Sequence, residues 1–318
     1  MTTCPAPFRT LIVNLLICCA SLVSALGQQQ QASAVPVQIT VTASRLGEEE
    51  VPEIRRERVT VKQNRNPVPV VEWVPARGNR AGLDLFVLID DASDTSLGSQ
   101  LNDIRSFVTS QPASTSVGIG YMRNATVDLA QNFTSDHAQA AQAIRLPKAN
   151  TGAFGSPYLS VIDLMNRWPE HHNRRVVIMI TDGIDRARGG PRSRLSNIIP
   201  DVDRASEVAQ RTGTLVYTIY APGVGHLRRN FWEANNGQIG ISKLSDETGA
   251  ESFYLGFQQA VSFKPYLEQI QKYLQDQYLL TFGAQPGRNE GLQSVSVDTD
   301  VAGTELLSAD SAWVPASK

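Results

Sequence analysis

The sequence predicts an α/β protein with a doubly wound, mainly parallel sheet and a small flanking β module made from the two chain ends. Between residues 81 and 276, continuous apolar runs typical of buried parallel strands alternate with segments whose apolar residues recur at helical spacing. Residues 28–80 and 277–318 instead show the alternation typical of half-buried strands. We therefore expect one large domain at 81–276 and a β segment on either side of it.

Composition limits the possible functions. The chain has 318 residues, 42% of them hydrophobic, which is enough for a buried core. Lys and Arg number 29 against 31 Asp and Glu, so the balance gives no sign of a nucleic-acid surface or a polybasic membrane patch. All three cysteines, Cys4, Cys18 and Cys19, precede residue 20, so the expected mature protein has no disulfide, thiolate nucleophile or cysteine-ligated zinc.

The N-terminus predicts export. Arg9 precedes an apolar run at residues 11–23, and Ala25-Leu26-Gly27 supplies small residues where a signal peptidase cleaves. We expect a signal peptide at 1–27, removed before Gln28, because the run is short for a membrane span and no later segment is long and apolar enough. The predicted location is periplasmic, cell-surface or extracellular. An exported chain without disulfides is more typical of bacteria.

A lipoprotein is the alternative reading of this leader. Cys18 and Cys19 follow Leu15-Leu16-Ile17, but a bulky Ile directly before the cysteine fits a lipidation signal poorly.

The flanking segments supply the expected β module. Residues 37–41 alternate, and residues 59–61 and 68–71 form a hairpin around an Asn/Pro turn. A linker at 78–80 leads into the large domain. The strands expected after that domain lie at 278–282, 295–297 and within 306–314. We expect the strands of the two ends to pair with one another.

The large domain is expected to alternate strands and helices. Strands are predicted at 85–89, 117–122, 126–129, 176–180, 215–220 and 253–255, and helices at 97–108, 141–144, 158–165, 202–212, 244–248 and 267–274. Residues 223–240 are interpreted as a long connection, which is a candidate for partner binding.

Polar side chains follow the predicted strands where parallel sheets bind ligands, at the carboxyl ends. Asp90, Asp91, Ser93 and Asp94 follow the first strand of the domain, Ser156 begins a later helix, and Asp182 follows the most apolar strand. Carboxylate and hydroxyl oxygens suit a hard divalent cation, with one position left for an incoming carboxylate.

These motifs resemble the von Willebrand factor A-type family over roughly residues 81–276. In that family an Asp-x-Ser-x-Ser loop, a Thr from a second loop and an Asp from a Thr-Asp-Gly-like turn form a metal-ion-dependent adhesion site. The matching segments here are the loop from Asp90, Gly155-Ser156-Pro157-Tyr158, and Thr181-Asp182-Gly183. The resemblance implies an adhesion-type binding domain with Mg²⁺ or Ca²⁺ at Asp90, Asp94, Ser156 and Asp182.

The motif departs from the family pattern. Alignment on Asp90 places Ala92 and Asp94 at the two serine positions, and mutual repulsion of three carboxylates could leave the site empty. A second register uses Asp91, Ser93 and Thr95, but it would reverse the side-chain alternation of the strand. Both registers keep Asp182.

Ordinary helix capping explains some of the same residues. Asp94 or Ser93 can cap the helix that begins near Leu97, and Ser156 can cap a helix with Pro157 at its first position. Neither role excludes metal ligation.

We expect a rim of basic side chains around the candidate metal site, whose aspartates form an acidic centre. Its members are Arg186, Arg188, Arg192, Arg194, Arg228 and Arg229. Such a rim would attract a protein ligand with acidic groups, whose carboxylate could complete a metal shell. The same arginines can equally be solvated loop charges, or can balance the Asp cluster.

The sequence therefore predicts an exported protein-binding module for adhesion or envelope assembly, and not an enzyme. A metal-free scaffold of an envelope assembly is the alternative. A hydrolase would need Ser156 or Ser93 with His226 and Asp182, but neither serine lies in a Gly-x-Ser-x-Gly elbow, and phosphate-loop and dinucleotide fingerprints are absent. The overall plan also resembles a group of exported von Willebrand factor A-related proteins common in acidobacteria.

Overall fold

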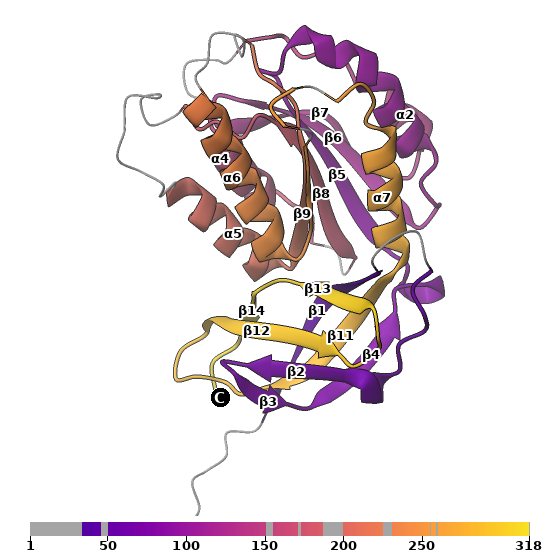
Figure 1. The fold of residues 1–318 in the computed structure, drawn as a ribbon, viewed down its shortest axis with the longest axis vertical. Coiled ribbons are helices and arrows are strands. Elements are labelled where there is room, and N and C mark those ends of the chain that lie inside the picture. Colours follow the sequence, from indigo (N-terminus) through magenta and orange to yellow (C-terminus); the bar gives the residue numbers. More distant parts are fainter. Residues whose placement is uncertain are drawn as a thin grey trace, which may run out of the picture.

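A six-stranded sheet forms the centre of the protein (Figure 1). The computed structural model describes residues 34–45, 50–150, 155–170, 173–186, 200–224, 231–254, 256–258 and 260–317. The strand order is β10-β9-β8-β5-β6-β7, with β7 antiparallel at one edge and the other strands parallel. Their bounds are β5 (Leu83–Asp90), β6 (Thr115–Arg123), β7 (Thr126–Thr134), β8 (Arg174–Thr181), β9 (Thr214–Tyr220) and β10 (Ser252–Phe253).

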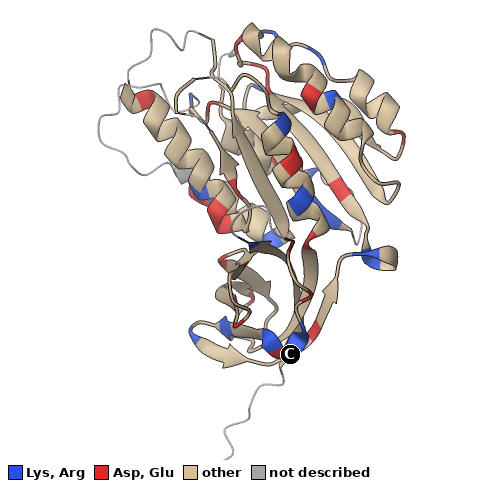
Figure 2. Ribbon diagram, turned by 45° about the vertical axis from the view of Figure 1, so that its right-hand side comes forward, with Lys and Arg blue, Asp and Glu red and all other residues tan. Residues whose placement is uncertain are grey.

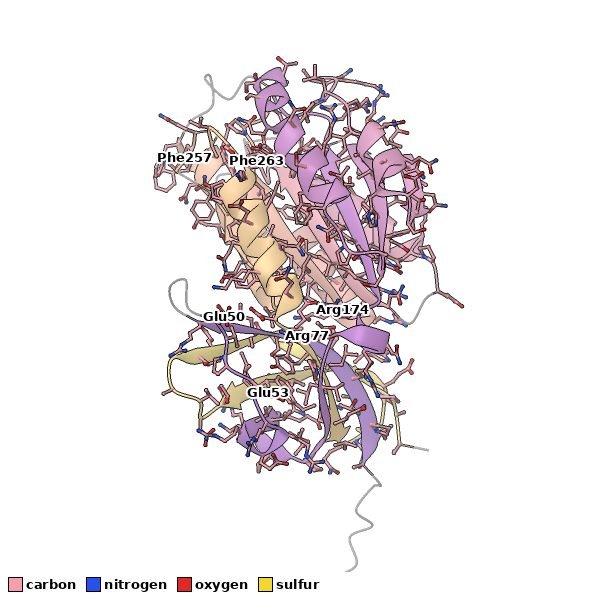
Figure 3. All side chains as sticks on the ribbon, turned by 90° about the vertical axis from the view of Figure 1, so that its right-hand side faces the viewer. Glu50, Glu53, Arg77, Arg174, Phe257 and Phe263 are labelled. Atoms are coloured by element: carbon pink, nitrogen blue, oxygen red, sulfur yellow. The ribbon has the colours of Figure 1, made fainter. Side chains whose placement is uncertain are left out.

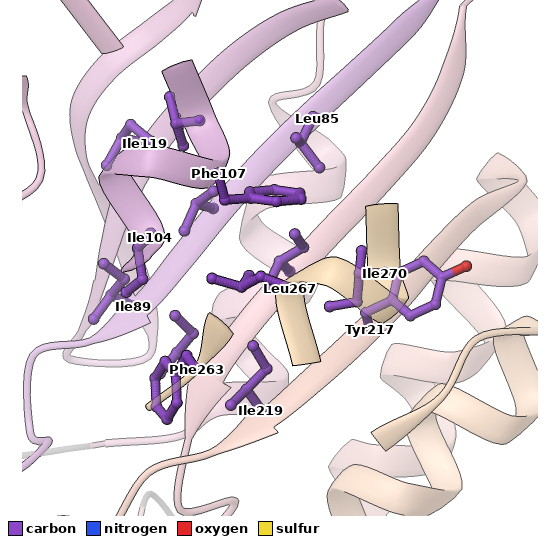
Figure 4. Packing of buried hydrophobic residues seen from close by; sticks show 14 of the residues in the cluster. Leu85, Ile89, Ile104, Phe107, Ile119, Tyr217, Ile219, Phe263, Leu267 and Ile270 are labelled. Carbon is purple, nitrogen blue, oxygen red and sulfur yellow. The ribbon is translucent and has the colours of Figure 1, made fainter. Parts of the chain in front are cut away.

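Helices cover both faces of this sheet, which explains the continuous apolar runs of β5, β8 and β9. One face carries η3 (Thr95–Gln100), α2 (Leu101–Thr109), α3 (His137–Gln142) and α7 (Lys264–Gln275). The opposite face carries α4 (Pro157–Asn166), α5 (Pro200–Thr212) and α6 (Phe231–Thr248). Figure 4 shows Ile104 and Phe107 of α2 and Leu267 and Ile270 of α7 packed over Leu85 of β5 and its neighbours.

The two chain ends form a β module of two four-stranded sheets, with orders β13-β1-β11-β4 and β14-β12-β2-β3. Each sheet combines strands from before and after the α/β domain, as expected from the sequence. In the first, Val35 to Thr42 of β1 pair antiparallel with Ala284 to Gln277 of β11. The bounds are β1 (Val35–Arg45), β2 (Val59–Gln63), β3 (Asn66–Val68), β4 (Val70–Pro75), β11 (Gln277–Ala284), β12 (Gly291–Thr299), β13 (Thr304–Ser308) and β14 (Ser311–Val314).

The expected hairpin of the N-terminal segment is present, but its second arm divides between the two sheets. Asn64 and Arg65 have φ of 49° and 69°, the positive values of a tight two-residue turn, so Val61 pairs with Val68. After β3 the chain crosses to the other sheet as β4, where Trp73 stacks on Tyr278 with ring centroids 4.4 Å apart. Short 3₁₀ helices, η1 (Arg56–Arg58) and η2 (Gly78–Arg80), complete this segment.

The prediction of a long connection at 223–240 is wrong over residues 231–240, because α6 begins at Phe231. Gly237 and Gly240 have low helix propensity and interrupt the apolar spacing, which hides the first half of this helix in the sequence. The helix expected at 244–248 is the last part of α6.

The β module lies at the amino-terminal edge of the central sheet (Figure 1). Arg174, which begins β8, is buried there and donates to the carbonyl oxygens of Leu274 at 3.1 Å and Ala81 at 3.0 Å. Figure 3 shows Arg174 and Arg77 where the module meets the α/β domain. The carboxyl edge of the sheet, where the candidate site lies, is therefore remote from the module. Within the described residues, no helix has the length and apolar character needed to span a membrane.

Phe263 and Val261 provide a matched test of the core. Phe263 is 0% exposed and packs between α7 and the sheet, whereas Val261, two residues earlier, is 93% exposed. Phe263→Ala should lower the free energy of unfolding by about 3–5 kcal/mol because it leaves a cavity, while Val261→Ala should change it by less than about 0.5 kcal/mol. Urea unfolding followed by circular dichroism measures both. Equal effects of the two substitutions would contradict this packing.

Candidate functional site

Two buried carboxylates lie at the carboxyl edge of the sheet. Asp90 is the last residue of β5, and Asp182 directly follows β8, the neighbouring strand. Both side chains are buried. Parallel pairing of β5 with β8 brings these strand ends together, as the sequence predicts.

Both oxygens of Asp90 accept hydrogen bonds. The amide of Ala92 donates to Oδ1 at 2.9 Å, and the hydroxyl of Thr181 donates to Oδ2 at 2.8 Å. Thr181 is the last residue of β8, so this bond joins the ends of the two strands directly. Asp90 is thereby fixed in one orientation within the edge of the sheet.

The side chain of Asp182 is bound by residues of the loop that follows β8. The amide of Ile184 donates to its Oδ1 at 3.0 Å, and the guanidinium of Arg186 contacts its Oδ2 at 2.7 Å. The side chain of Arg186 is only 19% exposed, and its backbone amide donates to the carbonyl oxygen of Gly155 at 2.6 Å. The sequence left open whether Arg186 belongs to a basic rim or balances the Asp cluster, and its ion pair with Asp182 corresponds to the second alternative.

Ser156 lines a small cavity beside these residues. Asp90, Ser156 and Arg186 line a space of about 10 Å³, together with Ala92, Met122, Arg123, Ala125, Gly155, Pro157 and Ser160. The hydroxyl of Ser156 accepts from the amide of Leu159 at 3.3 Å and caps α4, with Pro157 at the first helical position, as the capping interpretation predicts.

The electrostatics of the cavity reflect burial of two like charges. Burial raises the pKa of Asp90 to about 6, the charge of Asp182 adds to the rise, and Arg186 and the two hydrogen bonds oppose it. Burial would lower the pKa of Arg186, but the charges of Asp182 and Asp90 outweigh burial and raise it. The guanidinium is therefore the counter-ion of both carboxylates.

This arrangement does not fit Mg²⁺ or Ca²⁺. These ions take six or more oxygen ligands, several of them usually water, whereas the cavity beside Asp90 and Ser156 has room for only about one water molecule. A cationic side chain already contacts Asp182. Among the described residues, no cluster of three or more His, Cys, Asp or Glu side chains is suited to hold a metal ion.

The residues of the second register lie apart from the cavity. Asp91 is buried on the other face of the sheet, where it pairs with Arg145 at 2.7 Å and accepts from the amide of Lys148 at 2.8 Å. Ser93 is buried, and within the described part of the chain its hydroxyl has no hydrogen-bond partner. Thr95 is exposed in η3.

Asp94, a metal ligand in the first register, does not line the cavity with Asp90 and Ser156. It caps η3 instead, by accepting from the amide of Ser96 at 2.9 Å.

Several expected residues lie outside the described ranges. They are the signal peptide, His226 and five members of the expected rim, Arg188, Arg192, Arg194, Arg228 and Arg229. The basic rim therefore stays a prediction for these five residues.

Three features of the site were missed in the sequence. Thr181 bonds to Asp90, Arg123 lines the cavity from the end of β6, and Gly237 of α6 packs on the loop of Asp182. A Cβ atom on Gly237 would lie 2.2 Å from the carbonyl oxygen of Asp182. Gly183, with φ of 70°, meets the same stretch of α6. Gly183 after β8 and Gly237 within the later helix are the sequence signal that could have indicated such close approach.

No protein-family model matches the sequence, and no curated protein is similar to it. Solved structures with a similar fold include an aerotolerance-related membrane protein from Bacteroides fragilis, at 12% identity over 61% of this chain and 98% of that one, with a TM-score of 0.42. BatB from Bacteroides thetaiotaomicron has 15% identity over 60% and 98%, and a TM-score of 0.42. The SpRpn10 VWA domain has 9% identity over 58% and 94%, and a TM-score of 0.39.

Similarities at these identities and TM-scores say nothing of function. The resemblance to the von Willebrand factor A-type fold rests on the chain's own features: the strand order, the single antiparallel edge strand, and aspartates at the ends of β5 and β8.

Gly237→Ala tests the close approach of α6 to the site. Alanine favours a helix by up to about 1 kcal/mol over glycine, but the clash with the carbonyl oxygen of Asp182 involves backbone that must shift. We expect a net loss of about 1–3 kcal/mol in the free energy of unfolding. Gly291→Ala, whose new Cβ atom meets nothing within 4 Å, is the control in the same urea titration. A neutral or stabilising Gly237→Ala would show that the two backbones are not in contact.

The raised pKa of Asp90 predicts a pH dependence of stability. The folded protein holds this proton up to about pH 6, whereas the unfolded chain releases it near 3.8. Between these values the folded state binds more protons, so the contribution of Asp90 to the free energy of unfolding falls as pH rises from about 4 to 6, by on the order of 3 kcal/mol. Unfolding in urea at pH 4, 5, 6 and 7 measures it. Asp90→Asn should flatten this slope, and the exposed Asp298→Asn should not; an unchanged slope in Asp90→Asn would refute the assignment.

Proposed function

We propose that this chain is an exported protein-binding module, with no catalytic role, that contacts its partner through the carboxyl edge of the central sheet. The observation that carries the proposal is a group of exposed aromatic side chains at this edge, beside the buried acidic centre. Export rests on the leader at residues 1–27, which is a sequence-based expectation.

The aromatic group consists of two exposed residues, Phe231 and Trp232, and the half-buried Phe257. Phe231 is 61% exposed and Trp232 is 71% exposed, although both begin a helix whose later turns are buried. The rings of Trp232 and Phe257 both pack on Phe231, at centroid distances of 5.9 and 5.1 Å. Figure 3 shows Phe257 at the end of the α/β domain remote from the β module. Exposed aromatic clusters of this kind are typical of protein contacts, where Trp and Tyr contribute much of the binding energy.

The outer face of α6 continues this surface. Ile239 is exposed one heptad after Trp232 and, with the exposed Tyr254, lines a groove of about 500 Å³. The groove also contains Lys243, Asp246 and Glu247. An apolar centre with a charged border is the usual composition of a protein interface.

Arg123 offers a contact for an acidic group of the partner. It lines the site cavity, where its side chain is half-buried. Charged residues of both signs are spread over the rest of the protein, so recognition of charge would be local (Figure 2).

The contacts of the candidate nucleophiles support a non-catalytic role. The hydroxyl of Ser156 accepts the capping bond of α4, and Ser93 is buried away from the cavity that contains Asp90. A nucleophilic serine needs a general base within hydrogen-bond reach. Among the described residues, the group that contacts the hydroxyl of Ser156 is instead the backbone amide of Leu159.

A metal-free scaffold of an envelope assembly is the second candidate. The observation that favours it is the ion pair of Arg186 with Asp182, which fills the acidic centre without a metal ion. A scaffold would hold its partners through surfaces other than the aromatic group.

The test compares partner capture by three forms of the mature chain, immobilised and exposed to an envelope extract of the source organism. The partner should be retained by the wild type and by Val71→Ser, which removes another exposed apolar side chain, from the β module. Trp232→Ser should lose it, because a central aromatic contact contributes about 2 kcal/mol or more, over tenfold in affinity.

Capture that is the same for all three forms would contradict binding at the carboxyl edge and favour the scaffold. Turnover of generic ester or phosphoester substrates that Ser156→Ala abolishes would contradict the absence of catalysis.

A further inference from the structure

Arg186 holds a position that sequence resemblance assigns to a metal ion. It lines the cavity with Asp90 and Ser156, and its guanidinium contacts Oδ2 of Asp182 at 2.7 Å. Asp90, Ser156 and Asp182 are three of the four residues expected to hold Mg²⁺ or Ca²⁺. The first two line the same cavity as Arg186, and the third forms an ion pair with it.

The charges explain why a cation is needed. Asp90 and Asp182 are both buried, and burying two carboxylates side by side without a counter-charge is costly. Arg186 is the cation whose charge stabilises both, and they in turn raise its pKa. A guanidinium is more weakly hydrated than a divalent ion, so it enters a nearly closed cavity at lower cost.

The backbone fixes Arg186 in this position. Its amide donates to the carbonyl oxygen of Gly155 at 2.6 Å, immediately before the Ser156 cap. It is four residues from Asp182, whose Oδ1 is held by the amide of Ile184. The guanidinium is thus tethered at a very high effective concentration, which a dissolved ion at millimolar concentration does not match.

We propose that Arg186 is a built-in cation that replaces the divalent ion, and that removing its side chain exposes a latent metal site formed by Asp90, Ser156 and Asp182. The wild-type domain then keeps its acidic centre intact without metal. This inference does not depend on the chain binding a protein, so its failure would leave the proposed function untouched.

The test is calorimetric titration of the full mature chain with MnCl₂, MgCl₂ and CaCl₂, together with melting curves in 5 mM of each salt and in chelator. The wild type should show no saturable binding and no metal-dependent shift in Tm. Arg186→Ala should melt at a lower temperature in chelator, bind at least one of the ions with Kd on the order of 10⁻⁴ to 10⁻³ M, and regain part of the lost Tm with that ion.

Two controls separate this gain from a general effect of removing positive charge. Arg123→Ala deletes the other arginine of the same cavity, which has no ion pair among those found in the described residues, and it should bind no metal. Adding Asp182→Asn to Arg186→Ala should abolish the new binding. Arg186→Gln, which retains most of the side-chain volume, serves if the alanine variant does not fold.

Saturable metal binding by the wild type that Asp182→Asn abolishes would overturn the proposal. A folded Arg186→Ala or Arg186→Gln variant that binds none of the three ions would overturn it as well.

Discussion

Burial of Asp90 and Asp182 at the ends of two neighbouring strands is the constraint on which the rest of the site depends. The parallel sheet forces the two carboxylates together, and close packing of α4 and α6 removes them from water. Four polar contacts from the described residues reduce the resulting cost: the Thr181 hydroxyl, the amides of Ala92 and Ile184, and the guanidinium of Arg186. The loop after β8 places the side chain of Arg186 in the cavity only four residues after Asp182, where its charge opposes those of the two carboxylates.

The β module does not cover this edge of the sheet. It is built from both chain ends and packs at the amino-terminal edge, where Arg174 joins β8 to the end of α7 and to Ala81. The carboxyl edge keeps the acidic centre, Arg123 and the exposed aromatic pair Phe231 and Trp232 on one side of the molecule.

Much of the fold could be predicted because burial dictates it. Strands β5, β8 and β9 each contain a largely apolar run, and the alternation of both chain ends correctly indicated a shared β module. The placement of Asp90, Ser156 and Asp182 followed from the rule that strand ends meet at one edge. The sequence could not decide whether Arg186 forms part of a basic rim or balances the Asp cluster, because residues in an irregular loop have no periodicity that shows where a side chain points. The start of α6 was missed because Gly237, which looks like a helix breaker, is required for contact with the Asp182 loop.

Anomalous diffraction from crystals of the protein grown with Mn²⁺ tests the central claim most directly. The account predicts guanidinium density of Arg186 against Asp182 and no anomalous peak in the cavity lined by Asp90 and Ser156. A manganese peak bound by Asp90 and Asp182, with Arg186 displaced from the cavity, would contradict it.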